Sequence, residues 1–217
     1  MRIALTGGIA CGKSLLANYL NELGVETLDA DDIVHELMPE PERRRMADEV
    51  FRDPTKRKEL ERRIHPLVRA RLAAFAARGV RDGERGMGDE GRNPEPETRN
   101  QKPSTLGGSR GRSPSPTLNP QPSTIRIEII PLLFECHWEA DYDIILCVSS
   151  PRSLQVERMT MLRGYTEEQA EARLAAQLPV EEKAARSDYV IENGGSAEKL
   201  KAEAKKLVEW LKGLDNG

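Results

Sequence analysis

Long hydrophobic runs are missing from this sequence of 217 residues. No apolar stretch approaches the roughly 20 residues that a membrane-spanning helix needs. The short apolar stretch after Met1 and Arg2, residues 3–5, is also too brief for the core of a secretory signal. These absences argue against a membrane protein and against export, so we expect a cytoplasmic protein.

A dominant charge of one sign is also missing. The chain has 33 basic and 36 acidic residues, which leaves a net charge of −3 although charged residues make up 32% of the sequence. A protein that binds nucleic acid or an anionic membrane through its overall field carries a clear excess of positive charge. We therefore expect neither nucleic acid nor membrane among its partners.

The sequence has only three cysteines, and their spacing matches no common disulfide or metal-binding motif. Cys11, Cys136 and Cys147 form no C-x-x-C pair and are odd in number, which argues against a disulfide framework and a zinc ribbon. We expect buried or incidental thiols in a reducing compartment.

Apolar residues are nearly absent from residues 79–124. This stretch contains 8 of the 17 glycines and 7 of the 14 prolines, and only Val80, Met87, Leu106 and Leu118 as aliphatic residues or methionine. Such a composition cannot bury enough apolar surface to offset backbone entropy, so it predicts a disordered insertion. The rest of residues 1–217 is long enough for one domain with a sizeable core.

Outside that stretch, segments with strand character alternate with helical ones. The apolar runs predict strands at 2–6, 25–28, 125–134, 143–148 and 189–191, with helices between them. Helical sequence continues over 153–177 with a break at Gly164 and a capping residue at Thr166. Pro54 and Pro66 are expected at breaks or first turns of surface helices. This alternation predicts an α/β fold with a parallel sheet covered on both faces.

The first predicted strand leads into G-x-x-x-x-G-K-[ST], the phosphate-binding loop of P-loop proteins. Its glycines let successive N–H groups point at phosphate oxygens, and the lysine adds a full positive charge. The serine hydroxyl can serve a Mg²⁺ ion. A predicted strand before and a predicted helix after the motif favour a real phosphate loop over a chance match. It comprises Gly7, Gly8, Ile9, Ala10, Cys11, Gly12, Lys13 and Ser14.

Acidic residues follow the second predicted strand, as Asp29-Ala30-Asp31. The carboxyl ends of parallel strands face the crevice where ligands bind, so a carboxylate here could accept a proton from an acceptor hydroxyl. The alternative is that these acids only cap the next helix. A carboxylate that accepts a proton from an acceptor hydroxyl favours a kinase acting on a small molecule.

Several further motifs, in order along nearly the whole chain outside the insertion, resemble the dephospho-CoA kinase family. The resemblance implies a three-layer P-loop NTPase fold with a mobile helical lid. It also implies transfer of a phosphoryl group from ATP, with Mg²⁺, to the ribose 3′-hydroxyl of dephospho-CoA, the last step of coenzyme A synthesis. The segments that carry it are residues 5–9, 29–33, 64–68, 131–135, 158–177 and 187–194.

The resemblance also implies roles for individual residues. Asp31 would be the catalytic base, Lys13 would steady the transferred group, and Arg163 in a lid of about residues 158–179 would close over the phosphates. Ser14 would hold Mg²⁺, and Asn193 would lie in the adenine-side loop, although a turn-forming role beside Gly194 is nearly as plausible. Nucleotide-binding residues would be the whole phosphate loop with Leu15 and Asn193.

Some readings stay open at this point. His65 and Glu135 could each contact ligand or act only at a helix boundary. After Leu37 the chain is shorter than the family pattern on the acceptor side, so an alternative is a nucleotide-binding module without turnover. A GTPase is disfavoured because no N-K-x-D motif is present. We expect a monomer or weak homo-oligomer.

Overall fold

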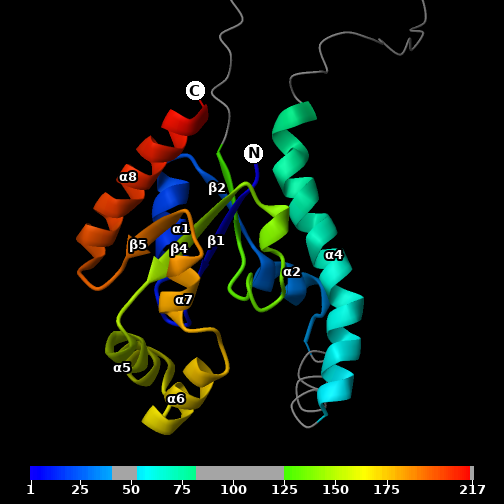
Figure 1. The fold of residues 1–217 in the computed structure, drawn as a ribbon, viewed down its shortest axis with the longest axis vertical. Helices are drawn as coiled ribbons and strands as arrows, with labels where there is room; N and C mark the ends of the chain where they lie inside the picture. Colours follow the sequence, from blue (N-terminus) through cyan, green and yellow to red (C-terminus); the bar gives the residue numbers. More distant parts are fainter. Residues whose placement is uncertain (41–52, 82–124, 216–217) are drawn as a thin grey trace, which may run out of the picture.

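Five parallel strands form the centre of the molecule, as the alternating pattern predicts (Figure 1). The computed structural model describes residues 1–40, 53–81 and 125–215. The strand order is β2-β3-β1-β4-β5, so β1 lies at the middle, with Leu5 paired to Ile129 on one side and Leu146 on the other. The strands are β1 (Ile3–Gly7), β2 (Glu26–Asp29), β3 (Arg126–Ile129), β4 (Ile144–Ser149) and β5 (Tyr189–Glu192).

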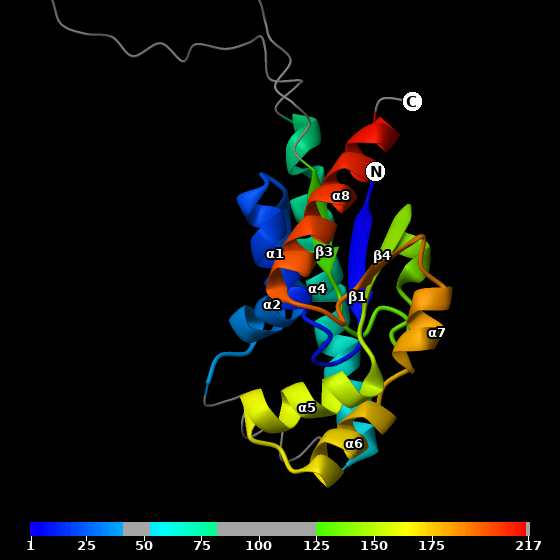
Figure 2. The ribbon, with the colours of Figure 1, turned by 90° about the vertical axis from the view of Figure 1, so that its left-hand side faces the viewer.

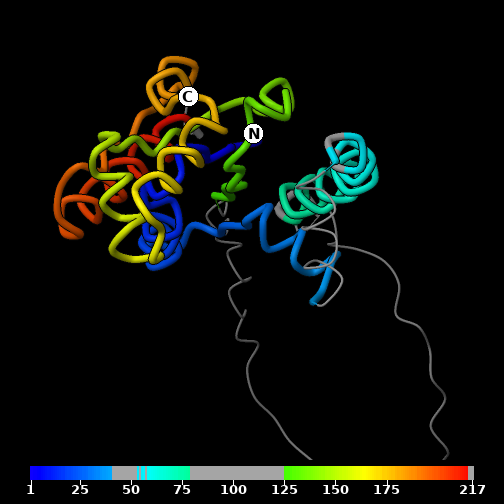
Figure 3. The backbone as a smooth tube through the Cα atoms, turned by 90° about the horizontal axis from the view of Figure 1, so that it is seen from below, coloured from blue at the N-terminus to red at the C-terminus, as the bar shows by residue number. Residues whose placement is uncertain are grey.

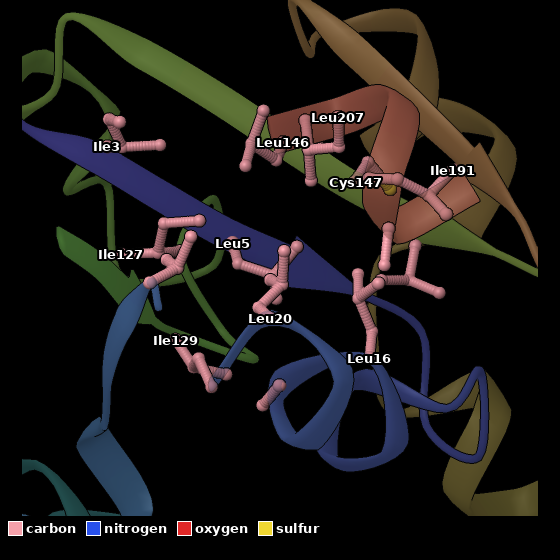
Figure 4. Close-up of a cluster of buried hydrophobic side chains, with 14 of the residues drawn as sticks. Ile3, Leu5, Leu16, Leu20, Ile127, Ile129, Leu146, Cys147, Ile191 and Leu207 are labelled. Carbon is pink, nitrogen blue, oxygen red and sulfur yellow. The ribbon is translucent and has the colours of Figure 1, made fainter. Parts of the chain in front are cut away.

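Two helices, α1 (Lys13–Glu22) and α8 (Ala197–Asp215), cover one face of the sheet. Leu16 and Leu20 of α1 and Leu207 of α8 are fully buried against strand residues such as Leu5 and Leu146 (Figure 4). Helical spacing places these leucines on one stripe of each helix. Burial of each such side chain stabilises the fold by about 1.5–3 kcal/mol, so this layer anchors the loop between β1 and α1.

The opposite face is covered by α2 (Ala30–Leu37), α4 (Pro54–Arg81) and the segment 130–138. Figure 3 shows α4 in cyan on the side away from α8 in orange and red. Val68 and Leu72 of α4 pack with Ile33 of α2 and with Leu133 in this layer. The result is a three-layer α/β sandwich, as predicted.

A helical hairpin of α5 (Arg152–Arg163) and α6 (Glu167–Ala175) lies beyond the carboxyl ends of the strands (Figure 2). Gly164 ends α5 in the left-handed conformation, and Thr166 begins α6 with a capping box to Gln169, so the predicted break and cap are both confirmed. Met159, Ala170 and Leu174 form the small core of the hairpin. Helix α7 (Val180–Ala185) then leads back to β5.

Three details differ from the sequence prediction. Helix α4 begins at Pro54 but continues through Pro66 for 28 residues, because burial of Val68, Leu72 and Phe75 offsets the hydrogen bond that proline cannot donate. The apolar run expected to form one strand over 125–134 stops being a strand at Ile129 and turns into the packed loop 130–138. The six-residue α7 is too short to show a periodicity and was not predicted.

The predicted insertion, residues 79–124, lies outside the described residues except for its first three, which end α4. The segment that directly follows residue 40 lies outside them as well. Among the helices that are described, none is long and apolar enough to cross a membrane.

Candidate active site

The predicted phosphate loop lies between the end of β1 and the start of α1, so its backbone wraps the N-terminus of a helix. Gly12 has φ 94°, and a Cβ built on it would lie 2.2 Å from Asn193 Nδ2. Only glycine fits there without strain, which explains the second glycine of the motif. A helix N-terminus with inward-facing N–H groups favours bound anions.

Lys13 is folded back onto this loop. Its ammonium group donates hydrogen bonds to the carbonyl oxygens of Gly7 and Gly8, both at 2.9 Å. Burial lowers the pKa of Lys13 from its ordinary value, and nearby charges modify that effect. A bound phosphate would supply a stronger acceptor for the same ammonium and oppose this shift.

A cleft of about 470 Å³ opens at the carboxyl edge of the sheet. It brings Asp31, at the start of α2, into the same space as the phosphate loop and Arg163. A carboxylate at the start of α2 and the phosphate loop therefore line one cleft at the same edge of the sheet. The cleft is lined by Ile9, Ala10, Gly12, Lys13, Ser14, Leu15, Asp29, Asp31, Pro131, Arg158, Leu162, Arg163, Gln177, Asn193, Gly195 and Ala197.

The two aspartates after β2 have different positions. Asp29 is the N-cap of α2, where Oδ1 accepts a hydrogen bond from the Asp31 backbone N–H at 2.9 Å. Burial raises the pKa of Asp29, and the capping bond opposes that effect. Asp31 is exposed to the cleft. Asp29 is thus the residue that caps the next helix. Asp31 lines the cleft, where an acceptor could bind.

A buried network holds the loop against the ends of β4 and β5. Asn193 Nδ2 donates to the Cys11 carbonyl at 2.8 Å, and Ser150 Oγ donates to the Asn193 carbonyl at 2.8 Å. Arg158 of α5 donates to the carbonyls of Ala10 and Asn193 at 3.1 and 3.0 Å. Sequence reasoning did not single out Arg158 or Ser150, although Arg158 begins the motif run 158–177.

Most of the predicted binding residues line the cleft, but Gly7, Gly8 and Cys11 do not. Gly8 instead packs against α5, where an added Cβ would lie 2.8 Å from Gln155 Oε1. Cys11 is fully buried, and burial raises the pKa of its thiol, which fits the prediction that it is a spacer and not a nucleophile.

His65 and Glu135, left open by the sequence, do not line the cleft. The His65 ring packs edge-on against Trp138 with centroids 5.0 Å apart, and burial lowers the pKa of His65. Glu135 accepts a hydrogen bond from the Leu178 backbone N–H at 3.0 Å, just ahead of α7. In both cases the contacts favour the structural alternative.

Oxygen donors suited to Mg²⁺ are present in the cleft. The Ser14 hydroxyl, at the first turn of α1, shares it with the carboxylates of Asp29 and Asp31. Hydroxyl and carboxylate oxygens match the preference of Mg²⁺, which usually keeps several waters and contacts few protein groups. The described part of the chain has no cluster of three or more His, Cys, Asp or Glu residues that could hold a metal by itself.

Gly12→Ala should destabilise the protein by about 1–3 kcal/mol, because the new Cβ meets a buried amide at a positive φ. Urea unfolding checks the free energy. Gly213→Ala is the matched control, since its Cβ meets nothing within 4 Å in α8, and alanine should stabilise that helix by about 0.5–1 kcal/mol. Equal stability of Gly12→Ala and the wild type would contradict this reading of the loop.

Comparison with known proteins identifies relatives of the chain. Residues 1–42 and 116–199 match the model of the family described as dephospho-CoA kinase. A dephospho-CoA kinase of Anaeromyxobacter dehalogenans is 32% identical, with alignment over 97% of this chain and 92% of that protein. The family model leaves residues 43–115 unmatched, and these include most of the predicted insertion.

Solved structures show the same fold. TT1252 from Thermus thermophilus superposes with a TM-score of 0.66 at 28% identity, covering 97% of each chain. The dephospho-CoA kinase from Campylobacter jejuni superposes with a TM-score of 0.61 at 21% identity, covering 99% of this chain and 98% of that one. The match to the family model and the identity shared with the bacterial relative together show that the chain belongs to the dephospho-CoA kinase family.

Proposed function

We propose that this chain converts dephospho-CoA to coenzyme A by transferring a phosphoryl group from ATP to the ribose 3′-hydroxyl. Phosphotransfer to dephospho-CoA is the activity of the family to which the chain belongs. The single observation that carries the proposal is that Asp31 and the phosphate loop line one cleft.

The phosphate loop would bind the ATP phosphates. Its N–H groups and the N-terminus of α1 favour negative charge, and Lys13 would exchange its bonds to Gly7 and Gly8 for phosphate oxygens. Phosphoryl transfer has a loose transition state with charge spread over the equatorial oxygens, so alignment and positive charge are the main requirements. Lys13 and Arg163 supply that charge in the cleft.

Asp31 would accept the proton of the acceptor hydroxyl. It is exposed to the cleft and its backbone is held at the start of α2 by the Asp29 cap, so its position is set by the end of β2. A positioned carboxylate base contributes about 10²–10⁴ in rate.

Arg163 would act from the C-terminal end of α5. The α5–α6 hairpin has its own small core and joins the rest through Arg158 and Gln155, which donate to the loop carbonyl of Ala10 and to that of Ser150. We propose that the lid is about residues 158–179, which comprise the second half of α5, all of α6 and the segment that leads to α7. Closure would exclude water and so suppress hydrolysis of ATP.

Ser14 is the residue that would hold Mg²⁺, directly or through its waters. When bound, the ion neutralises charge on the phosphates. Asn193 borders the cleft from the loop after β5, and its proposed place is on the adenine side. A cytoplasmic location, small-molecule partners only, and a monomer or weak homo-oligomer complete the proposal.

A coupled assay of ADP release tests the function. We expect turnover with ATP and dephospho-CoA, and little with AMP, UMP or no acceptor. Mass spectrometry of the product should show a phosphoryl group added at the ribose. Equal ADP release with and without dephospho-CoA would overturn the proposal. ATP binding without turnover, and without thermal stabilisation by dephospho-CoA, would instead support the nucleotide-binding module.

A further inference from the structure

Lys183 of α7 is completely buried, with no exposed side-chain surface. Its ammonium lies 2.7 Å from Glu135 Oε1 and donates a hydrogen bond to the Pro131 carbonyl at 2.9 Å. Lysine is almost never fully buried unless it is paired. These contacts connect α7 to two points of the loop that follows β3, and no step of the proposed reaction uses them.

The Glu135 carboxylate makes a second connection. Its Oε1 also accepts the hydrogen bond from the Leu178 backbone N–H, in the segment between α6 and α7. Its Oε2 is buried with no hydrogen-bond partner among the described residues. One carboxylate thus joins the loop after β3 to the segment that connects α6 with α7.

Both connected segments contribute to the cleft. Pro131, whose carbonyl accepts from Lys183, lines it from the loop after β3. Gln177, next to Leu178, lines it from the segment between α6 and α7, and Asp31 lines the same space. A shift of the Lys183–Glu135 pair would therefore move two parts of the cleft wall that face the proposed acceptor position.

The physical cost of the pair indicates what it does. Removing two charges from water is expensive, and replacing a buried ion pair by apolar residues is often neutral or stabilising by about 1–4 kcal/mol. Stability is thus a weak explanation for the pair, whereas a fixed geometry between two segments is a direct consequence of it.

We propose that Lys183 and Glu135 are positioning residues that hold the Pro131 side and the Gln177 side of the cleft at a fixed separation, and so align the acceptor with Asp31. The inference rests on the proposed function and extends it to residues that do not touch substrate.

The test compares Lys183→Met, Glu135→Gln and the double variant with wild type. Because a displacement of about 1 Å can cost about 10²-fold in rate, we expect kcat/KM for dephospho-CoA to fall by about 10- to 100-fold in the double variant. The Kd for ATP, measured by calorimetry, should stay within about two-fold of wild type because the phosphate loop is untouched. The Leu178 amide should lose protection from hydrogen exchange.

Arg2→Met/Glu128→Gln is the matched control. Arg2, which precedes β1, and Glu128 of β3 form another ion pair with a buried carboxylate, with 2.8 Å between Arg2 Nη2 and Glu128 Oε2, and neither residue lines the cleft. This control should change the unfolding free energy without changing the KM for dephospho-CoA. Each single variant leaves one buried charge unpaired, the carboxylate in Lys183→Met and the ammonium in Glu135→Gln, whereas the double variant leaves neither. Glu135→Gln keeps an oxygen that can accept hydrogen bonds from Lys183 and from the Leu178 N–H, so it serves if neither of the others folds.

The outcomes separate the two proposals. Wild-type protein without acceptor-dependent turnover overturns the function. An active wild type whose folded variants all keep the wild-type kcat/KM for dephospho-CoA overturns the positioning role. The positioning role would also be overturned if the Arg2→Met/Glu128→Gln control lost as much kcat/KM as the Lys183 and Glu135 variants. The pair would then contribute only to stability.

Discussion

Lys13→Ala should reduce dephospho-CoA phosphorylation by at least about 10³-fold. The ammonium is held in the phosphate loop by the Gly7 and Gly8 carbonyls, so its charge is already placed where phosphates would bind. Loss of a single preorganised electrostatic group costs about 10²–10³ in kcat, and weaker ATP binding adds to that loss. The coupled ADP-release assay measures kcat and KM, and calorimetry measures ATP affinity.

The control for this variant is Lys206→Ala. Lys206 lies on α8 as an exposed ion pair with Glu203, and it does not line the cleft. Its removal should leave turnover within about two-fold and stability within about 0.5 kcal/mol. Turnover by Lys13→Ala at the wild-type rate would show that the loop is not the phosphate site.

Asp31→Asn should lower kcat by about 10²–10⁴-fold, the usual contribution of a positioned base. Asparagine keeps the size of the side chain but cannot take the hydroxyl proton. ATP affinity should change much less than kcat, because the effect belongs to the transition state and not to ground-state binding. Steady-state kinetics and calorimetry together give this comparison.

Two neighbouring acids serve as controls. Asp32→Asn, one residue along α2 and outside the cleft lining, should be nearly neutral for kcat. Asp29→Asn keeps an oxygen that can cap α2, so it should lower stability only slightly. A fully active Asp31→Asn combined with an inactive Asp29→Asn would transfer the role of base to Asp29.

Features defined by local chemistry were predictable from the sequence. The phosphate loop needs glycines at set positions and a lysine at a set spacing, so its place between β1 and α1 followed from the motif. Gly164 and Thr166 likewise predicted the turn between α5 and α6, because a left-handed residue and a capping side chain act within one turn.

Features that depend on distant partners were not predictable in the same way. The sequence places Pro66 at a break or in the first turn of a helix, but α4 continues through it because its buried residues pack on the sheet layer. Arg158 was not recognised as a residue that supports the phosphate loop, since its carbonyl partners, Ala10 and Asn193, are 148 and 35 residues away. Neither contact has a local sequence signature.

The sequence by itself determined the α/β class, the phosphate loop and the strand-end position of Asp31, because each depends on residue type, spacing and periodicity over short stretches. Only the tertiary structure decided that Asp29 caps α2 while Asp31 faces the cleft. It also decided that Glu135 forms an ion pair with the buried Lys183 and does not line the cleft. The direction of a side chain and the partner of a buried charge are set by segments that meet through folding.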